Sequence, residues 1–166
     1  FEVPEELYYN LFDTERIPIA ITLTDDLNKT HAEFRPDLKE NIERERPEND
    51  SNGRIVLPRK LDDPVRILMN VKKIIEYSND GSMTWVGTFA HELTHALDYK
   101  QMAKAEGLES YEPLEKVEKY FMFQLWSEYH ARKRGYKFLR KYFEIAGELP
   151  DREEQIKHIK TNEWPY

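Results

Sequence analysis

The sequence contains no cysteine. This absence excludes disulfide bonds and thiolate metal sites, so a transition metal could be bound only through nitrogen and oxygen ligands. Basic residues are also fewer than acidic ones. The chain has 25 lysines and arginines and 32 aspartates and glutamates, which gives a formal net charge of -7. An acidic surface does not favour phosphate binding, and we therefore predict no nucleic-acid partner.

Long apolar runs are missing as well. No stretch approaches the roughly 18 consecutive apolar residues of a membrane-spanning helix, so we predict no membrane partner. The N-terminus has no basic start followed by an apolar run, and we expect a cytoplasmic location. Secretion stays an alternative, because the chain begins at Phe1 rather than at methionine. No pattern in the sequence indicates the oligomeric state.

Enough apolar material is present for one domain. The chain has 166 residues, of which 39% are hydrophobic, and we predict a single domain over residues 1–166. Short β-branched segments in the first half and long segments with a helical period in the second half predict an α+β fold. The expected architecture is a small mixed sheet packed on a site-bearing helix, followed by a second long helix.

The predicted elements follow from local patterns. The polar segment at 28–53 is expected to be a long surface excursion. Asp80 or Ser82 is expected to cap the site-bearing helix, and Gly107 to end it. Strands are predicted at 17–24, 54–57 and 65–69, the last two near prolines that suit a sheet edge, and helices at 4–12, 82–104, 113–145 and 151–160.

A motif with metal-binding spacing lies inside the helix predicted at 82–104, namely His91-Glu92-Leu93-Thr94-His95. Residues four apart in an α-helix differ by about 40° around its axis, so both imidazoles leave one face and can bind one ion. Glu92 lies about 100° from His91, beside the ion, where its carboxylate can accept a proton from metal-activated water. We therefore predict that His91 and His95 bind Zn2+ and that Glu92 is the catalytic base.

The motif is short, so chance must be considered. Random ordering of this composition gives about 0.02 expected matches. Phe89, Leu93, Ala96 and Leu97 surround the motif on a helix without internal Gly or Pro after Thr88, which favours a genuine site. The alternative is that the two histidines are merely polar residues on a half-buried helix face.

A catalytic zinc usually has three protein ligands and an open position for water, so a third ligand must come from elsewhere. Glu128 is the candidate, because it lies on the apolar stripe of the helix predicted at 113–145, where a carboxylate needs a cation partner. An inward glutamate that pairs with Lys or Arg, or reaches solvent, is the alternative. The stripe consists of Leu114, Val117, Phe121, Leu125, Ala131, Gly135, Phe138 and Tyr142.

Other polar residues near the motif have weaker claims on the ion. His130 lies about 200° from the candidate glutamate around the helix and is expected at the surface. His31 and His158 stand in polar segments and are expected in solvent. Asp98 follows His95 by three residues, and it either accepts the second N–H of a ligand imidazole or makes a surface contact.

These residues resemble the zincin metallopeptidases, specifically the glutamate-zincin group. The motif is very similar to the active-site helix of thermolysin-like enzymes, and the order of sheet, active helix and ligand helix looks most like the compact ImmA/IrrE-type peptidases. The resemblance spans about 55–135 and is architectural outside the motif. It implies a sheet edge at 67–70 that holds the substrate backbone, metal ligands His91, His95 and Glu128, and the general base Glu92.

Three functions are compatible with the sequence. The first is a zinc metallopeptidase acting on a protein or peptide substrate, in which Tyr111, Tyr129 or His130 would donate a hydrogen bond to the oxyanion. The second is a zincin-fold regulatory or binding module that retains zinc but turns over little. The third is a metal-free α+β interaction domain in which the motif is accidental.

Overall fold

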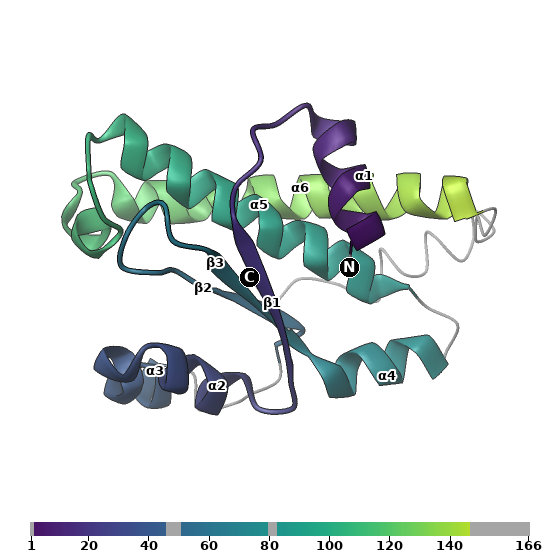
Figure 1. Ribbon diagram of the computed structural model, residues 1–166, viewed down its shortest axis with the longest axis horizontal. Coiled ribbons are helices and arrows are strands. Elements are labelled where there is room, and N and C mark those ends of the chain that lie inside the picture. Colours follow the sequence, from purple (N-terminus) through teal and green to yellow (C-terminus); the bar gives the residue numbers. More distant parts are fainter. Residues whose placement is uncertain (1, 46–50, 80–82, 147–166) are drawn as a thin grey trace.

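The computed structural model describes residues 2–45, 51–79 and 83–146. Over these residues the fold is α+β, with a three-stranded mixed sheet (Figure 1). No helix in this part of the chain is both long and apolar enough to cross a lipid bilayer. The elements in chain order are α1 (Glu2–Phe12), β1 (Ile19–Thr24), α2 (Leu27–Phe34), η1 (Pro36–Leu38), α3 (Lys39–Glu45), β2 (Gly53–Val56), β3 (Val65–Asn70), α4 (Val71–Asn79), α5 (Thr84–Ala105), η2 (Glu112–Lys116) and α6 (Tyr120–Ala146).

The strands lie in the order β1-β3-β2, with β1 parallel and β2 antiparallel to β3. The prediction that 65–69 forms a sheet edge is therefore wrong, since β3 is the central strand. Pro64 precedes the strand and removes none of its hydrogen bonds, and the amide of Val65 still donates to the carbonyl of Pro18 at 3.0 Å. The prediction of an edge strand near 54–57 is confirmed by β2.

Helices cover both faces of the sheet. This explains why nearly all residues of the central strand β3 are apolar, since side chains on either face are buried. Figure 1 shows α5 and α6 on one side of the sheet and α2, α3 and α4 on the other. Alternate residues of β3 therefore belong to two clusters. Val65, Ile67 and Met69 join the main core with α5, whereas Leu68 packs with Val56 and Leu27 under α2.

The helix α5 forms the middle of the molecule and carries the motif. Its inner face is fully buried at Phe89, Ala90 and Leu93. The helix ends as predicted at Gly107, whose φ of 65° is accessible to glycine without strain. There the amide of Gly107 donates to the carbonyl of Lys104, and that of Leu108 to Ala103. The predicted caps at positions 80 and 82 lie outside the described residues.

Two polar stretches are helical where no helix was predicted. The segment expected to be a surface excursion at 28–53 contains α2 and α3. Asp26 caps α2 by accepting a hydrogen bond from the amide of Lys29 at 2.9 Å. Similarly, α4 follows β3 directly, and Asn70 accepts a hydrogen bond from the amide of Lys72 at 3.1 Å. The helices α2 and α4 thus each begin at a side-chain cap that lies at or just after the end of a strand.

The second long helix starts later than predicted. Instead of one helix at 113–145 there is a short η2, an extended residue Val117 with ψ of 129°, and then α6. The predicted apolar stripe is right at Leu114, which is buried in η2, but it is wrong at two positions of α6 that lie about 100° or more around the helix from its buried face. Phe121 and Leu125 are exposed, and α6 instead buries Ser127, Ala131 and Phe138. The helix predicted at 151–160 lies outside the described residues.

The two long helices cross with their backbones in close approach at Gly87 of α5 and Gly135 of α6. A Cβ atom added to Gly135 would lie 3.1 Å from the carbonyl oxygen of Gly87 and 3.5 Å from Cβ of His91. A side chain at this point would push the helices apart. The crossing therefore holds α6, and with it Glu128, close to the motif.

Candidate metal centre

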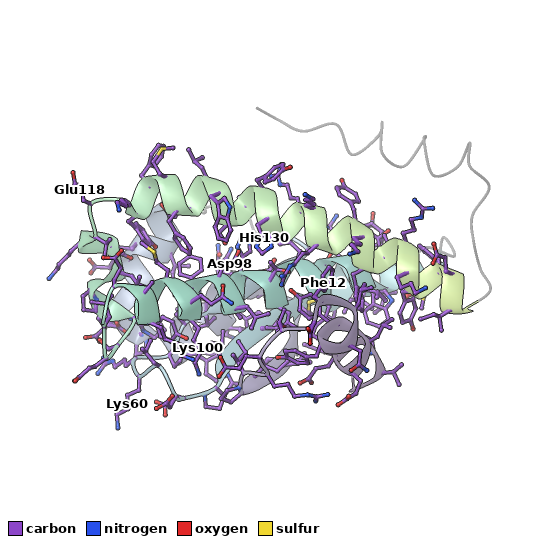
Figure 2. All side chains as sticks on the ribbon, turned by 90° about the horizontal axis from the view of Figure 1, so that it is seen from above. Phe12, Lys60, Asp98, Lys100, Glu118 and His130 are labelled. Carbon is purple, nitrogen blue, oxygen red and sulfur yellow. The ribbon has the colours of Figure 1, made fainter. Side chains whose placement is uncertain are left out.

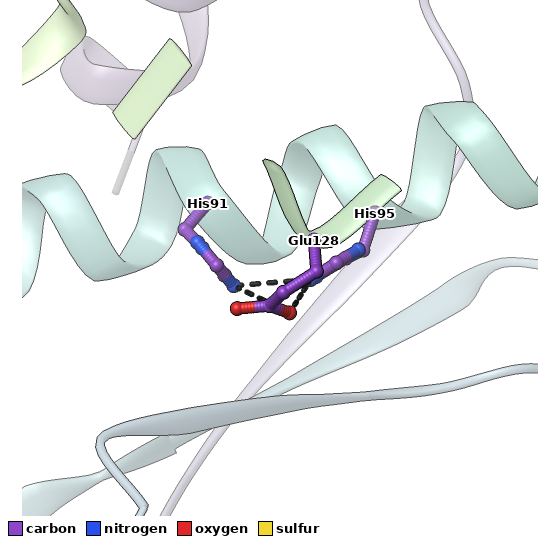
Figure 3. Close-up of side chains that lie close together, drawn as sticks. All are labelled: His91, His95 and Glu128. Carbon is purple, nitrogen blue, oxygen red and sulfur yellow. Dashed lines mark hydrogen bonds and ion pairs between the residues drawn. The ribbon is translucent and has the colours of Figure 1, made fainter. Parts of the chain in front are cut away.

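Three donor atoms from the two long helices converge beside α5 (Figure 3). Nε2 of His95 lies 3.0 Å from Nε2 of His91 and 3.2 Å from Oε2 of Glu128. The third separation, from His91 Nε2 to Glu128 Oε2, is 3.8 Å. The three residues chosen from the sequence as metal ligands are therefore neighbours in the fold, although they come from segments more than 30 residues apart.

The spacing of these atoms fits a tetrahedral ion. Zinc binds imidazole nitrogen and carboxylate oxygen at about 2.0–2.2 Å, which separates two ligands of a tetrahedron by about 3.3–3.5 Å. The observed separations of 3.0, 3.2 and 3.8 Å bracket this range. Two imidazoles and one carboxylate are also a donor set that zinc accepts. The group is thus able to hold a divalent metal, and the identity of the ion stays a prediction.

The two histidines differ in charge preference. Burial, together with a smaller effect of the neighbouring His95, lowers the pKa of His91 to about 4, and Glu128 opposes the shift. Burial also acts to lower the pKa of His95, but the hydrogen bond to Glu128 and the charges of nearby carboxylates raise it above its ordinary value. One positive charge is therefore stabilised between the imidazoles and Glu128, where a cation would lie.

Glu128 is held by two partners through different oxygens. Its Oε2 faces His95, while Oε1 accepts a hydrogen bond from Nε of Arg132 at 2.6 Å. The hydrogen bond from His95 lowers the pKa of Glu128 to about 2, against the effect of burial, and Arg132 contributes to the shift. Glu128 therefore pairs with an arginine, as in the alternative prediction, but only through Oε1. Its Oε2 remains directed at the two histidines.

A second row of polar residues lies behind His95, between α5 and α6. Nδ1 of His95 is 2.8 Å from Oγ of Ser127, and Ser127 donates to Oδ2 of Asp98 at 2.9 Å. On the far side, Nδ1 of His130 is 2.9 Å from Oδ1 of Asp98. Figure 2 shows Asp98 and His130 facing one another across the two helices. Burial raises the pKa of Asp98, and the charge of His130 and the two hydrogen bonds oppose this shift.

This row determines the tautomer of His95. A serine hydroxyl has one proton, and Ser127 gives it to Asp98, so Ser127 must accept the Nδ1–H of His95. With Nδ1 holding its proton in this bond, Nε2, which otherwise donates to Glu128, is the nitrogen that would lose its proton to bind the candidate ion. Asp98 therefore reaches His95 indirectly, through Ser127. Neither of the two roles predicted for Asp98, a direct hydrogen bond to a histidine or a surface contact, describes this arrangement. The prediction that His130 lies at the surface is wrong, because its side chain is only 23% exposed and pairs with Asp98.

Replacing Ser127 with alanine is expected to weaken zinc binding about 10- to 100-fold, the usual effect of losing a hydrogen bond that orients a metal ligand. The change leaves the Nδ1–H of His95 and one oxygen of Asp98 without their shared partner. Zinc affinity is measured by competition with a chromogenic chelator. Ser78→Ala, at an exposed serine of α4, is the matched control and should bind as the wild type does. Equal affinities in all three proteins would exclude the orienting role.

Glu92 lies on the same helix and its side chain turns to the sheet. It is only 8% exposed, and a Cβ atom added to Gly53 would lie 3.0 Å from Cγ of Glu92 and 3.0 Å from Cγ2 of Thr88. Gly53 is the first residue of β2. The edge strand next to the predicted base is therefore β2, and the expectation that 67–70 forms the substrate-binding edge is wrong because that segment is in the central strand.

The remaining sequence candidates lie in different surroundings. Tyr111 is 4% exposed within the main core, Tyr129 is on the outer side of α6, and His130 is already bound to Asp98. His31 is half-buried on α2, so the prediction that its side chain lies in solvent is only partly correct. His158 lies outside the described residues.

The chain was compared with protein-family models, curated proteins and solved structures, and none of the three comparisons finds a match. The resemblance to the zincins therefore depends on the motif and on the arrangement of the residues described above.

Proposed function

We propose that this protein is a zinc-dependent metallopeptidase with His91, His95 and Glu128 as metal ligands and Glu92 as general base. The observation that carries the proposal is the meeting of three donor atoms, all within 4.8 Å of one another, beside the buried carboxylate that follows His91 in the motif. A structural zinc site would be closed by four protein ligands, whereas three ligands with one half-exposed member leave a position for a reactant. The side chain of Glu128 is 42% exposed.

The proposed reaction is hydrolysis of a peptide bond. When bound, zinc supplies a Lewis acid that makes water nucleophilic near neutral pH and polarises a carbonyl group. Glu92 accepts the proton of the attacking water as the oxygen–carbon bond forms, and it delivers that proton to the leaving nitrogen as the carbon–nitrogen bond breaks. Ser127 keeps His95 in the required tautomer, and Arg132 fixes the unused oxygen of Glu128.

The strand β2 is suited to hold the substrate backbone. Among the described residues it pairs with β3 on one side only, which leaves its other edge for a further strand. An extended peptide can bind there by main-chain hydrogen bonds. Because Gly53 of this strand lies beside Glu92, a peptide added to the edge would pass close to the general base.

The test is zinc-dependent cleavage by the full chain. Purified protein is stripped with a chelator, and hydrolysis of casein, an unfolded protein, is followed by the release of new amino groups. We expect activity to disappear on stripping and to return on addition of one equivalent of zinc. A protein that binds zinc and cleaves neither casein nor short peptides would instead be a regulatory or binding module. A protein that binds no zinc would contradict the proposal entirely.

A further inference from the structure

The outer side of α6 carries a band of large apolar side chains that no described element covers. Around a helix with about 100° per residue, these side chains lie opposite the buried Ser127, Ala131 and Phe138. Each is between 45% and 68% exposed. Exposed apolar surface of this extent is typical of binding sites. The outer band consists of Phe121, Met122, Leu125, Trp126, Tyr129 and Tyr136.

The same helix is basic in a protein whose net charge is -7. Lys133 lies on the outer side between Tyr129 and Tyr136, and it forms no ion pair with another described residue. A cation surrounded by aromatic surface attracts carboxylates. The only acidic residues of α6 are Glu128 and Glu144, against the six basic residues Arg132, Lys133, Arg134, Lys137, Arg140 and Lys141.

An open groove connects this outer band with the candidate metal centre. It has a volume of about 530 Å³ and contains Glu128 in its wall. Because one oxygen of Glu128 faces His95 and the other faces Arg132, a molecule in the groove would contact a metal ligand. The other lining residues are Leu125, Tyr129, Arg132, Lys133 and Tyr136.

We propose that the groove and the outer band of α6 form a docking site for an acidic, aromatic-containing segment of the protein substrate. The inference rests on the proposed function, since it gives the substrate of that site a second contact with the protein. Apolar side chains of the segment would cover the outer band, and its carboxylates would pair with Lys133 and neighbouring cations. Binding at such a remote contact selects one target over others with a similar scissile bond.

Two other occupants fit the observations less well. A second copy docked through α6 about a two-fold axis would bring the cations of both helices against one another. An anionic bilayer presents charge over a wide area and would also face the acidic remainder of the surface, whereas a short segment meets α6 alone. Charge complementarity at this scale therefore favours a peptide.

The experiment measures peptide binding without cleavage. The probe is a fluorescein-labelled peptide of twelve residues in which Glu and Asp alternate with Phe and Leu, and its control has Lys in place of each acid. Both are titrated with zinc-loaded full chain carrying Glu92→Gln, and binding is followed by fluorescence polarisation. We expect the acidic peptide to bind at least tenfold more tightly than the lysine peptide. Equal affinity for both peptides would overturn the proposal.

The docking site is then altered within the same background. Lys133→Glu combined with Tyr136→Ser is expected to weaken binding of the acidic peptide at least tenfold. The matched control, Lys72→Glu combined with Ile75→Ser, makes the same charge reversal and also removes one exposed apolar side chain, both on α4, and should leave binding unchanged. Circular dichroism and bound zinc must be alike in all proteins. Unchanged binding in the α6 variant, or equal loss in both variants, would contradict the assignment.

Other outcomes separate the docking site from the catalytic proposal. If the wild type cleaves nothing but binds the peptide through α6, the peptidase fails and the docking surface stands. If the wild type cleaves short neutral peptides while the α6 variant binds the acidic peptide normally, the docking site is excluded and the proposed peptidase activity is supported. Binding of α6 to phosphatidylserine vesicles without peptide binding, or a dimer in analytical ultracentrifugation that the α6 variant dissolves, would assign the surface to a different occupant and overturn the proposal.

Discussion

Replacing Glu92 with glutamine is expected to lower kcat/KM about 10²- to 10⁴-fold and to leave bound zinc unchanged. Glutamine has nearly the same size but cannot accept the proton of the attacking water or return it to the leaving nitrogen. The predicted ligands His91, His95 and Glu128 are untouched, so the metal should remain. Hydrolysis of casein and zinc content by atomic emission are measured on the same preparation.

The control for this change is Glu106→Gln, at an exposed glutamate just after the end of α5. It removes one carboxylate from the same region of the chain and should have wild-type activity. A Glu92→Gln protein with activity within a few fold of the wild type would rule out Glu92 as the base. Loss of zinc together with activity would instead make Glu92 part of the metal-binding group.

Replacing His91 with alanine is expected to lower zinc affinity at least about 100-fold. Loss of a residue that only orients a ligand already costs 10- to 100-fold, and removal of a ligand itself should cost more. Zinc should also raise the melting temperature of the wild type, because an ion that binds only the folded state adds about 2.7 kcal/mol at a hundredfold excess over its Kd. That thermal shift should be absent in the variant.

Comparison with other substitutions tests the ligand set. His31→Ala, on α2, serves as the matched histidine control and should bind zinc and be stabilised by it as the wild type is. Glu128→Ala should weaken zinc binding clearly, since it removes the only donor that α6 supplies to the group. If His91→Ala bound zinc as well as His31→Ala does, the ligand assignment would be incorrect.

The motif residues were predictable because their geometry is local. Positions 91 and 95 lie one turn apart in any α-helix, so the sequence alone places both imidazoles on one face. The third donor depends on tertiary packing, and its selection rested on a stripe that is only partly correct. Leu125 is exposed and Glu128 is half-exposed at the side of α6. The residue converges with the histidines, but the reason is the crossing of the helices rather than deep burial.

Other features were missed because their signals are weak in isolation. Asp26 and Asn70 are ordinary helix caps, and with them α2 and α4 could have been predicted. Ser127 gave no such signal, because a serine within a helix bridges two residues of another helix only after packing. The position of β3 at the centre of the sheet is likewise a matter of strand pairing, which Pro64 just before the strand does not reveal.

The close contact of Gly87 and Gly135 at the helix crossing is a pivot point for Glu128, the proposed third ligand. Glu128 precedes Gly135 by seven residues, which corresponds to a lever arm of about 10 Å along α6. A pivot of only about 1° around that point would move the carboxylate by about 0.2 Å, the tolerance of a metal–ligand distance. If the proposed centre binds an ion, its affinity would thus depend on the angular stiffness of the two helices as well as on His91, His95 and Glu128 themselves.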